Sequence, residues 1–447
     1  MKSIIKLDIL ASLFAMALAC ISCDKQAENL INPQDDDQVV EENVVSKPEV
    51  SSTPTELPET RLSLSPEQMK NISPGNDFTF RFFEKAYSNP KSQDVGNMIL
   101  SPISVQFVCG MLGNLIEDRT ELCRMLGFEG NDIYDINNYF KTLIGDLVKE
   151  NDASTLCLAN ALMKDTRAAA FPVDFIDVLK SYYSADYLEF EALSLDDLPV
   201  GKRPEDLWVK EKTLGMIDSA PQPILKEDYS LFNTICFKGD WVTKFDPSNT
   251  ATHPFANYEE KTVNNVPMMN HTSVYPYYKN DDFRSVSLPM GDGSYYLTVI
   301  LPQQYKSLKE IINKLDSNTW NTLRASLEDK KVKLGIPKFS TEYYNPYLFG
   351  LLDENFIKDY FTQVDKKLEE DFENTHWFNA LIQKAVFRMD EDGASAAAVT
   401  QAHRLTSSGN AETIEEFIAD HPFVYIISDA GSGLVLFMGT YSGKTAN

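Results

Sequence analysis

Apolar residues recur with the period of an α-helix in three segments of the chain. The first follows Ser101-Pro102, a pair typical of a helix start because Ser caps free backbone N–H groups and Pro suits the first turn. Its apolar face comprises Phe107, Val108, Met111, Leu112 and Leu115. We predict two further helices over 172–183 and 205–217.

Apolar runs rich in β-branched and aromatic residues predict strands elsewhere. The five predicted strands span 229–238, 295–301, 332–337, 423–427 and 434–441. Helices and strands do not alternate strictly along the chain, which favours an α+β class with large mixed sheets. The 447 residues and their apolar content of 43% are enough for a sizeable core.

The charge balance of the chain is strongly acidic. Lys and Arg number 41 against 66 Asp and Glu, a formal net charge of -25. Nucleic-acid binding needs clustered basic residues, so this balance argues against such a partner. Between 24 and 60, ten acids face two bases and no aromatic residue occurs. This composition cannot bury enough apolar surface to offset the entropy of ordering, so we expect a disordered acidic spacer, assigned to residues 24–70.

The N-terminus has the pattern of an export signal. Lys2 and Lys6 precede an apolar run over 9–21 that is too short to span a membrane. Both Cys20 and Cys23 resemble the lipid-modified cysteine of bacterial lipoproteins. Cys23 is favoured because the polar chain starts after it, although Cys20 has the better small residue before it. We expect a signal peptide over 1–23 and a lipid anchor that holds an extracellular domain at the outer membrane or surface of a bacterial cell envelope. An ordinary secretory signal is the alternative.

One segment near the C-terminus has little bulk on either face. After Glu391, Asp392 and Gly393 it continues with Ala394, Ser395, Ala396, Ala397, Ala398, Val399 and Thr400. It lacks the apolar period that would dock a helix. An exposed loop is the simple interpretation. The alternative is a strand that slides between two existing strands, because small side chains need little room.

Six short motifs stand in order along the chain. They are Asn97 to Ser104 (NMILSPIS), Asn233 to Trp241 (NTICFKGDW), Val266-Pro267-Met268-Met269, Ile336-Pro337-Lys338-Phe339, Glu391 to Thr400 followed by Phe417 to Phe423 (FIADHPF), and Leu436-Phe437-Met438-Gly439. Each is weak alone. Together, from about residue 76 to residue 444, they resemble the serpins, a family of serine protease inhibitors.

The resemblance implies a serpin fold over 71–447. This is an α+β fold with three large mixed sheets, about nine helices and an exposed reactive loop near the C-terminus. It implies a suicide-substrate inhibitor of serine endopeptidases and not an enzyme. The target protease would cut the loop, form a covalent acyl-enzyme and be trapped when the loop inserts into the central sheet. No cofactor or metal is implied. The expected partner is a serine protease, with a cysteine protease as a further target class, and the chain is expected to be a monomer.

The resemblance implies that the small segment after Glu391 is the hinge of the reactive loop. Alternate side chains of a strand face opposite sides. Those expected to face the protein interior are Ala394, Ala396, Ala398 and Thr400. Small side chains can enter there without overpacking, whereas a bulky or charged one could not. Gly393 would be the pivot, because Gly accepts large backbone changes.

The position of the reactive bond stays open between two sites. The family's spacing from Gly393 gives Ser407-Ser408, and small residues there predict an elastase-like target. Arg404-Leu405 would suit a trypsin-like protease with an acidic pocket, but it would shorten the inserted strand. Counting back from Pro422 gives a point near Ala411, which predicts a longer loop than is common.

The resemblance also assigns residues that control opening of the central sheet. It implies a cluster of Asn97, Ser101, Ser104 and Asn233. It also implies an ion pair between Lys338 and Glu391, with Trp241 packed beneath. The family usually has His where this chain has Gln383. A Gln amide both donates and accepts hydrogen bonds, so the network can persist.

The sequence also permits functions other than inhibition. The fold could serve a non-inhibitory surface lipoprotein that binds a carbohydrate or a protein. Hydrolases are less favoured: His421 is the most tempting catalytic candidate, but a structural role at a strand entrance is the better interpretation.

Four cysteines lack the spacing of a disulfide framework or a metal site, so we expect them to be free and buried. They are Cys109, Cys123, Cys157 and Cys236.

Overall fold

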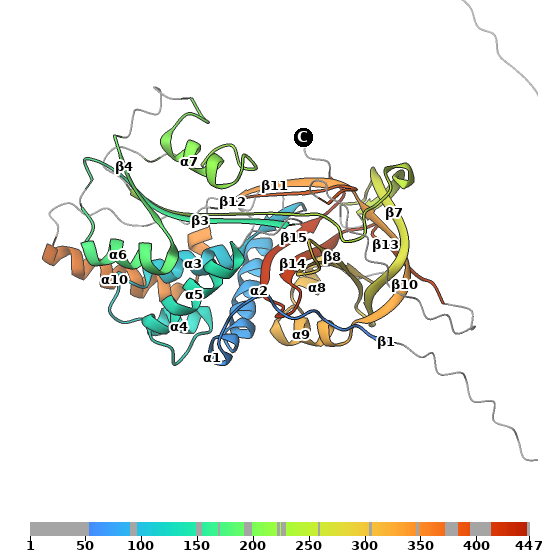
Figure 1. Ribbon diagram of the computed structural model, residues 1–447, viewed down its shortest axis with the longest axis horizontal. Coiled ribbons are helices and arrows are strands. Elements are labelled where there is room, and N and C mark those ends of the chain that lie inside the picture. The colour runs from blue at the N-terminus through green and yellow to red at the C-terminus, as the bar shows by residue number, and fades with distance from the viewer. Residues whose placement is uncertain are drawn as a thin grey trace, which may run out of the picture. The chain divides into compact units, whose positions relative to one another are not determined.

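The computed structural model (Figure 1) describes most of the predicted domain. The described residues are 53–89, 96–148, 154–168, 170–191, 199–220, 224, 229–257, 260–303, 306–345, 348–371, 383–393 and 413–444. The predicted signal peptide, with Cys20 and Cys23, lies outside them. The inserting segment from Ala394 to Thr400 and both candidate reactive bonds, Ser407-Ser408 and Arg404-Leu405, lie outside them as well.

Helices and strands are mixed along the described chain. The α-helices are α1 (Pro66–Met69), α2 (Ile72–Ser88), α3 (Pro102–Leu112), α4 (Thr120–Leu126), α5 (Ile133–Leu147), α6 (Val173–Tyr183), α7 (Pro204–Lys212), α8 (Leu308–Ile312), α9 (Ser317–Ala325) and α10 (Glu354–Asp371). The strands are β1 (Thr53–Pro54), β2 (Met98–Leu100), β3 (Ser154–Asp165), β4 (Asp186–Phe190), β5 (Tyr229–Gly239), β6 (Ala251–Asn257), β7 (Thr262–Lys279), β8 (Phe283–Met290), β9 (Tyr295–Pro302), β10 (Glu328–Pro337), β11 (Phe339–Asn345), β12 (Gln383–Met389), β13 (Glu415–Ile418), β14 (Phe423–Asp429) and β15 (Val435–Tyr441). Two 3-10 turns, η1 (Pro247–Asn249) and η2 (Leu348–Leu351), complete the described elements.

The largest sheet contains ten strands in the order β1-β10-β7-β8-β9-β14-β15-β2, with β6 on β7 and β13 on β10. Every residue of β14 and β15 is buried, which explains why both read as continuous apolar runs. On α2 the aromatic residues Phe78, Phe80, Phe82 and Phe83 are buried in the same core. The helix therefore packs its aromatic face into the core around β15.

Two smaller sheets hold the site described below. One has the order β4-β3-β5 and the other pairs β11 with β12. Leu156, Leu158 and Leu162 of β3 face the main core, and α3 and α5 contact this side. Ala161 and Met163 face the opposite side, where α7 packs (Figure 1). The alternation of β3 thus buries both faces of its sheet under helices.

The predicted α+β class is confirmed, and all five predicted strands are present. Three sheets and ten α-helices in the described chain match the implied three sheets and about nine helices, since α1 and α8 are only four and five residues long. The four cysteines are free and buried, as expected.

Two helix predictions need correction. Ser101 precedes α3, but its side chain does not cap the helix; its hydroxyl donates to the Leu436 carbonyl over 2.7 Å. The helix predicted over 205–217 ends at Lys212. Leu214 and Gly215 adopt positive φ angles of 52° and 76°, which an α-helix cannot contain.

Residues 53–70, which we expected to belong to a disordered spacer, take part in the fold. Leu62 is buried in the core. The backbone N–H and hydroxyl of Ser63 donate to Asp146, and the Thr60 hydroxyl donates to Asp429 over 2.9 Å. The composition of the segment is polar, but its few leucines find apolar partners that only the folded domain supplies. Residues 24–52 lie outside the described chain.

Candidate functional site

The candidate site is the boundary between β5 and β12, where two sheets lie side by side without a shared ladder. Across the described residues, β5 pairs with β3 and β12 pairs with β11, and no ladder joins β5 to β12. The two strands are nevertheless neighbours, and Val386 of β12 packs against the apolar cluster on the α7 side of β3. We call this boundary the β5–β12 gap.

The two strands run in the same direction along the gap. Asn233 of β5 and Gln383 of β12 both bind residues at the start of α3. Beyond the other ends of the strands, Trp241 and Asp390 bind each other. The gap therefore has one end at α3 and another at Trp241, and a strand entering from the Trp241 end would be antiparallel to both neighbours.

At the α3 end, the Ser104 side chain and the Ser101 backbone hold the two strands. The Ser104 hydroxyl donates to the Asn233 side chain, which donates onward to Asn160 of β3 over 2.7 Å. The Gln383 amide accepts from the Ser101 N–H over 2.8 Å and donates to the Ser101 carbonyl over 3.0 Å. All these groups are neutral, so α3 bridges the gap by hydrogen bonds alone.

Asn97 does not join this cluster. Its amide donates to the Lys444 carbonyl over 2.8 Å and accepts from the Ser442 N–H over 2.9 Å. It therefore ties the residue before β2 to the segment that follows β15. The implied cluster is reduced to Ser101, Ser104 and Asn233, with Gln383 beside it.

At the other end, Glu391 holds the turn that follows β12. Lys338, between β10 and β11, donates to its carboxylate over 2.6 Å, and the Thr250 hydroxyl donates over 2.8 Å. The Glu391 side chain is 10% exposed and that of Lys338 is 44% exposed. Burial alone would raise the pKa of Glu391, but the two hydrogen bonds outweigh it and the pKa lies below its usual value. The hydrogen bond to Glu391 raises the pKa of Lys338.

The same turn lies against the end of β5. The Trp241 indole N–H donates to the Asp390 carbonyl over 2.7 Å, and the Phe245 N–H donates to the Glu391 carbonyl over 3.1 Å. Trp241 is buried and stacks edge-on against Phe245. The chain reverses here, because Asp390 and Gly393 form an isolated antiparallel bridge.

Gly393 fits this place only because it has no side chain. Its φ is 87°, in the left-handed region. A Cβ atom at Gly393 would lie 2.5 Å from the Trp241 nitrogen and 2.6 Å from the Asp240 Cα. Gly393, the last described residue before the predicted inserting segment, thus lies at the Trp241 end of the gap.

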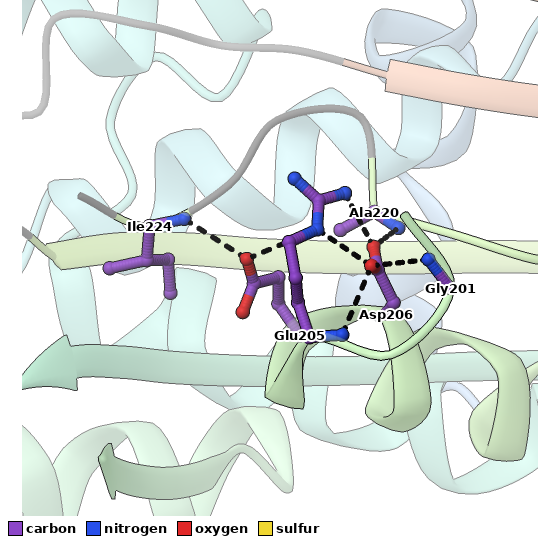
Figure 2. A network of polar contacts seen from close by, with 6 residues as sticks. Gly201, Glu205, Asp206, Ala220 and Ile224 are labelled. Carbon is purple, nitrogen blue, oxygen red and sulfur yellow. Dashed lines mark hydrogen bonds and ion pairs between the residues drawn. The ribbon is translucent and has the colours of Figure 1, made fainter. Parts of the chain in front are cut away.

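A polar network fastens α7 and the chain after it over this sheet (Figure 2). The Asp206 carboxylate accepts from the Arg203 guanidinium over 2.6 Å and from the Ala220 N–H over 2.9 Å. Glu205 accepts from the Ile224 N–H over 3.2 Å. Burial raises the pKa of Glu205, whereas the hydrogen bonds to Asp206 overcome its burial and lower its pKa. Two adjacent carboxyl groups therefore pin the connection between α7 and β5.

Sequence reasoning missed Asn160 and this network. The available signals were a polar Asn within the apolar strand LCLANALM and a Pro followed by two acids, which marks a helix start. Neither signal names a partner, because Asp206 and Ala220 meet only through the folding of α7 onto the sheet.

His421 occupies a structural position. Its Nδ1 lies 2.7 Å from an Asp420 carboxylate oxygen, and its Nε2 lies 2.9 Å from the Pro302 carbonyl oxygen. The described chain contains no group of three or more His, Cys, Asp or Glu residues placed to hold a metal ion. Among its helices, none is both long and apolar enough to cross a membrane.

Comparisons with known proteins agree with this architecture. The family model described as Serpin (serine protease inhibitor) matches residues 73–443. The chain is 26% identical over 396 residues to an uncharacterized serpin-like protein of Thermococcus kodakarensis, covering 86% of this chain and 88% of that protein. It is 27% identical over 389 residues to the leukocyte elastase inhibitor of Xenopus tropicalis, covering 84% and 100%. The crystal structure of the thermophilic serpin Tengpin in the native state superposes with a TM-score of 0.69 at 24% identity, covering 87% of this chain and 97% of that one.

Proposed function

The chain belongs to the serpin family, whose members are typically serine protease inhibitors, and we propose that it traps its target protease by inserting its cut reactive loop into the β5–β12 gap. The observation that carries this proposal is the position of Gly393. This expected pivot lies at the Trp241 end of the gap between two strands that do not pair with each other, and the residues that follow it are small.

The proposed reaction begins as ordinary proteolysis. The hydroxyl of the protease serine attacks the carbonyl carbon of Ser407, the bond to Ser408 breaks, and the freed amine of Ser408 leaves with a proton. The product is an ester between the protease and Ser407. Insertion of the cut segment then moves the attached protease before water can hydrolyse this ester.

Strand lengths support Ser407 as the residue that carries the protease. From first to last residue β5 spans about 33 Å, whereas the segment from Gly393 to Ser407 spans about 46 Å as a strand. An inserted strand paired along β5 would therefore carry Ser407 roughly 13 Å past the far end of β5. If Arg404 carried the protease instead, the ester would lie only near the end of that strand. The protease would be displaced less, so its active site would be less distorted.

We propose an elastase-like target. Small residues at Ser407-Ser408 suit a shallow primary pocket. The leukocyte elastase inhibitors of Xenopus tropicalis and Bos taurus, at 27% and 28% identity, are consistent with this choice. A trypsin-like target would cut at Arg404-Leu405 instead.

The deciding experiment mixes the protein with elastase and, separately, with trypsin. We expect a denaturation-resistant adduct at the summed mass with elastase, and a released peptide that begins at Ser408. A peptide beginning at Leu405 would move the target class to trypsin-like proteases. Cleavage without an adduct by either protease would refute trapping and favour a non-inhibitory binding role.

Insertion itself is tested by Ala394→Arg, with Ser395→Arg as the matched control. Ala394 is expected to face the interior and Ser395 the opposite side. A buried, unpaired Arg should block insertion, so the loop of Ala394→Arg is cut while the adduct falls at least about tenfold. Ser395→Arg should retain the adduct. Equal adduct from both variants would contradict insertion in this register.

We also propose that the chain is a monomeric bacterial lipoprotein anchored through Cys23, with Cys20 as the alternative. The support is the pattern of the first residues, an apolar run that ends at small residues and cysteine. Incorporation of a labelled fatty acid should be lost in Cys23→Ser and kept in Cys20→Ser. Incorporation that persists in the double variant would refute the anchor.

A further inference from the structure

Two of the four free cysteines face each other across neighbouring strands. Cys157 near the start of β3 and Cys236 near the end of β5 are register partners in the antiparallel ladder. Directly opposed residues of such a ladder project to the same face, with their Cα atoms about 4.5 to 5.5 Å apart. That face is the side of β3 that α7 covers, because Ala161 and Met163 share it with Cys157.

The two thiols contact each other beneath the end of α7. Cys157 is 9% exposed and Cys236 is 1% exposed. The Cys236 thiol donates to the Thr213 carbonyl over 3.8 Å. Its interaction with Cys157 lowers the pKa of the Cys157 thiol, although burial opposes this. The same interaction, together with burial, raises the pKa of Cys236.

This arrangement meets the geometric requirement of a disulfide. Bridged cysteines have Cα atoms 4.4 to 6.8 Å apart, which includes the spacing of opposed ladder residues. The other two cysteines lack such a partner: Cys109 lies within α3, and the Cys123 thiol in α4 donates to the Asn131 carbonyl over 3.5 Å. The described chain therefore carries one pair whose expected Cα spacing suits a disulfide and two cysteines that serve as internal controls.

We propose that Cys157 and Cys236 form a redox-controlled disulfide that ties β3 to β5. The oxidant is a disulfide, either a small molecule such as oxidised glutathione or a thiol–disulfide oxidoreductase. The Cys157 thiolate attacks one sulfur of the oxidant and releases one thiol, giving a mixed disulfide. Cys236 loses its proton and attacks the Cys157 sulfur, which releases the second thiol. Two protein thiols become one disulfide while the oxidant disulfide becomes two thiols.

The tie lies on the edge of β5 that faces away from the gap. A strand that enters between β5 and β12 leaves the β3–β5 ladder intact. The disulfide would therefore stabilise the sheet in the intact protein without obstructing insertion. This consequence rests on the proposed function, whereas the formation of the bond does not.

The test counts alkylated thiols in the full chain, with Cys20→Ser and Cys23→Ser to remove the N-terminal thiols. The protein is incubated with oxidised glutathione, or refolded in it, then denatured and treated with N-ethylmaleimide. We expect four labelled thiols in the reduced protein and two after oxidation, with a cross-linked peptide pair that contains Cys157 and Cys236. Four labelled thiols after both treatments would overturn the proposal.

Cysteine variants show which thiols are consumed. Cys109→Ser should still lose two thiols on oxidation, whereas Cys236→Ser should form no intramolecular disulfide. A cross-link that contains Cys109 or Cys123 would contradict the assignment. Because a variant could fold poorly, the protein that keeps both Cys157 and Cys236 is also compared in its oxidised and reduced forms by thermal unfolding. The disulfide should raise the unfolding midpoint by roughly 5 to 10 °C.

Trapping of elastase separates the disulfide from the proposed function. An oxidised sample with two labelled thiols and an unchanged adduct yield would support both proposals. If two thiols are labelled and the adduct is lost only on oxidation, the disulfide is retained. The claim that it does not obstruct insertion is then refuted. Two labelled thiols without adduct in either redox state would retain the disulfide and refute the inhibitor function.

Discussion

At the residue scale, one carboxylate and one glycine hold the turn that leads into the proposed hinge. Glu391 is mostly buried and accepts hydrogen bonds from Lys338 and Thr250. Gly393 leaves the backbone room to lie against Trp241. The first residue holds the turn by charge and the second by the absence of a side chain, so substitutions at the two positions should have different signatures.

Glu391→Gln tests the charge at the hinge. It should lower the free energy of unfolding by about 1 kcal/mol at neutral pH, a modest loss because Lys338 is nearly half exposed. The folded-state pKa of Glu391 lies below its reference value of 4.5, so its stabilisation is complete above that value and is lost as the pH falls through the folded pKa. Urea unfolding between pH 7 and pH 3 should show the two proteins converge in acid.

Glu342→Gln is the control for this measurement. Glu342 pairs with Lys384 over 2.9 Å, but its side chain is 60% exposed, so its loss should be near zero. A deficit for Glu391→Gln that stays constant with pH would show that packing, and not charge, holds the hinge.

Gly393→Ala tests the close approach of the backbone. We expect a loss of about 3 kcal/mol, because an Ala in the left-handed region is strained by 1 to 2 kcal/mol and its Cβ would also collide with the end of β5. Gly130→Ala has the same strain, with φ at 86° and no atom within 4 Å, and should lose only about 1 kcal/mol. Thermal unfolding of the two variants separates the cost of the left-handed backbone from the cost of the Cβ collision. Equal losses would mean that the turn at Gly393 moves aside freely.

At the scale of elements, α3 joins two strands that do not pair with each other. Ser104 holds β5 through Asn233, and Ser101 holds β12 through Gln383. These bonds must rearrange if a strand enters the gap. The neutral Gln383 in place of the family's usual His leaves the bridge without an ionisable group between Ser101 and β12.

Gln383→Leu tests this bridge. The substitution keeps the volume but leaves the N–H and carbonyl of Ser101 without their amide partner in a buried place, which should cost about 2 kcal/mol of unfolding free energy. Gln363→Leu is the control: its amide also binds backbone groups, at Glu117 and Asp118, but on the surface, where water replaces it. Urea unfolding should show a much smaller loss for the control. Similar losses would mean that the Gln383 bonds add little to closure of the gap.

At the scale of the whole molecule, the sheet under α7 is incomplete. The three-stranded and two-stranded sheets lie beside each other with their facing edges unpaired across the described strands. A single inserted strand would join them into one sheet. Under the proposed mechanism the native arrangement has fewer hydrogen bonds than the cut and inserted one, and this difference would supply the free energy for moving a protease.

Cleavage of the reactive loop should therefore stabilise the protein. A strand paired with β5 on one side and β12 on the other adds roughly ten to fifteen backbone hydrogen bonds at about 1 kcal/mol each. We expect the thermal midpoint to rise by more than about 20 °C. Scanning calorimetry of intact and loop-cleaved protein measures this rise. Cleaved Ala394→Arg should show little of it, and an unchanged midpoint in the cleaved parent would mean that no strand is added.

Much of the architecture follows from local patterns in the chain. Apolar runs predict the five strands, and the order of the motifs indicates the family. The pairing of Glu391 with Lys338 could be anticipated only through that resemblance, since more than fifty residues separate them. The helix start at Ser101 shows the limit of a local rule, because the hydroxyl that should cap α3 binds Leu436 of a distant strand instead.

The sequence by itself determined the class of fold, the elements with strong apolar periodicity and the small, uncharged side chains from Ala394 to Thr400. These properties depend on side-chain size, polarity and period, which are local. Only the tertiary structure decided that Cys157 faces Cys236, that Asp206 accepts a hydrogen bond from Ala220, and that β5 and β12 do not pair with each other. Strand register and helix docking bring together residues far apart in the chain, and many alternative pairings would satisfy the same local pattern.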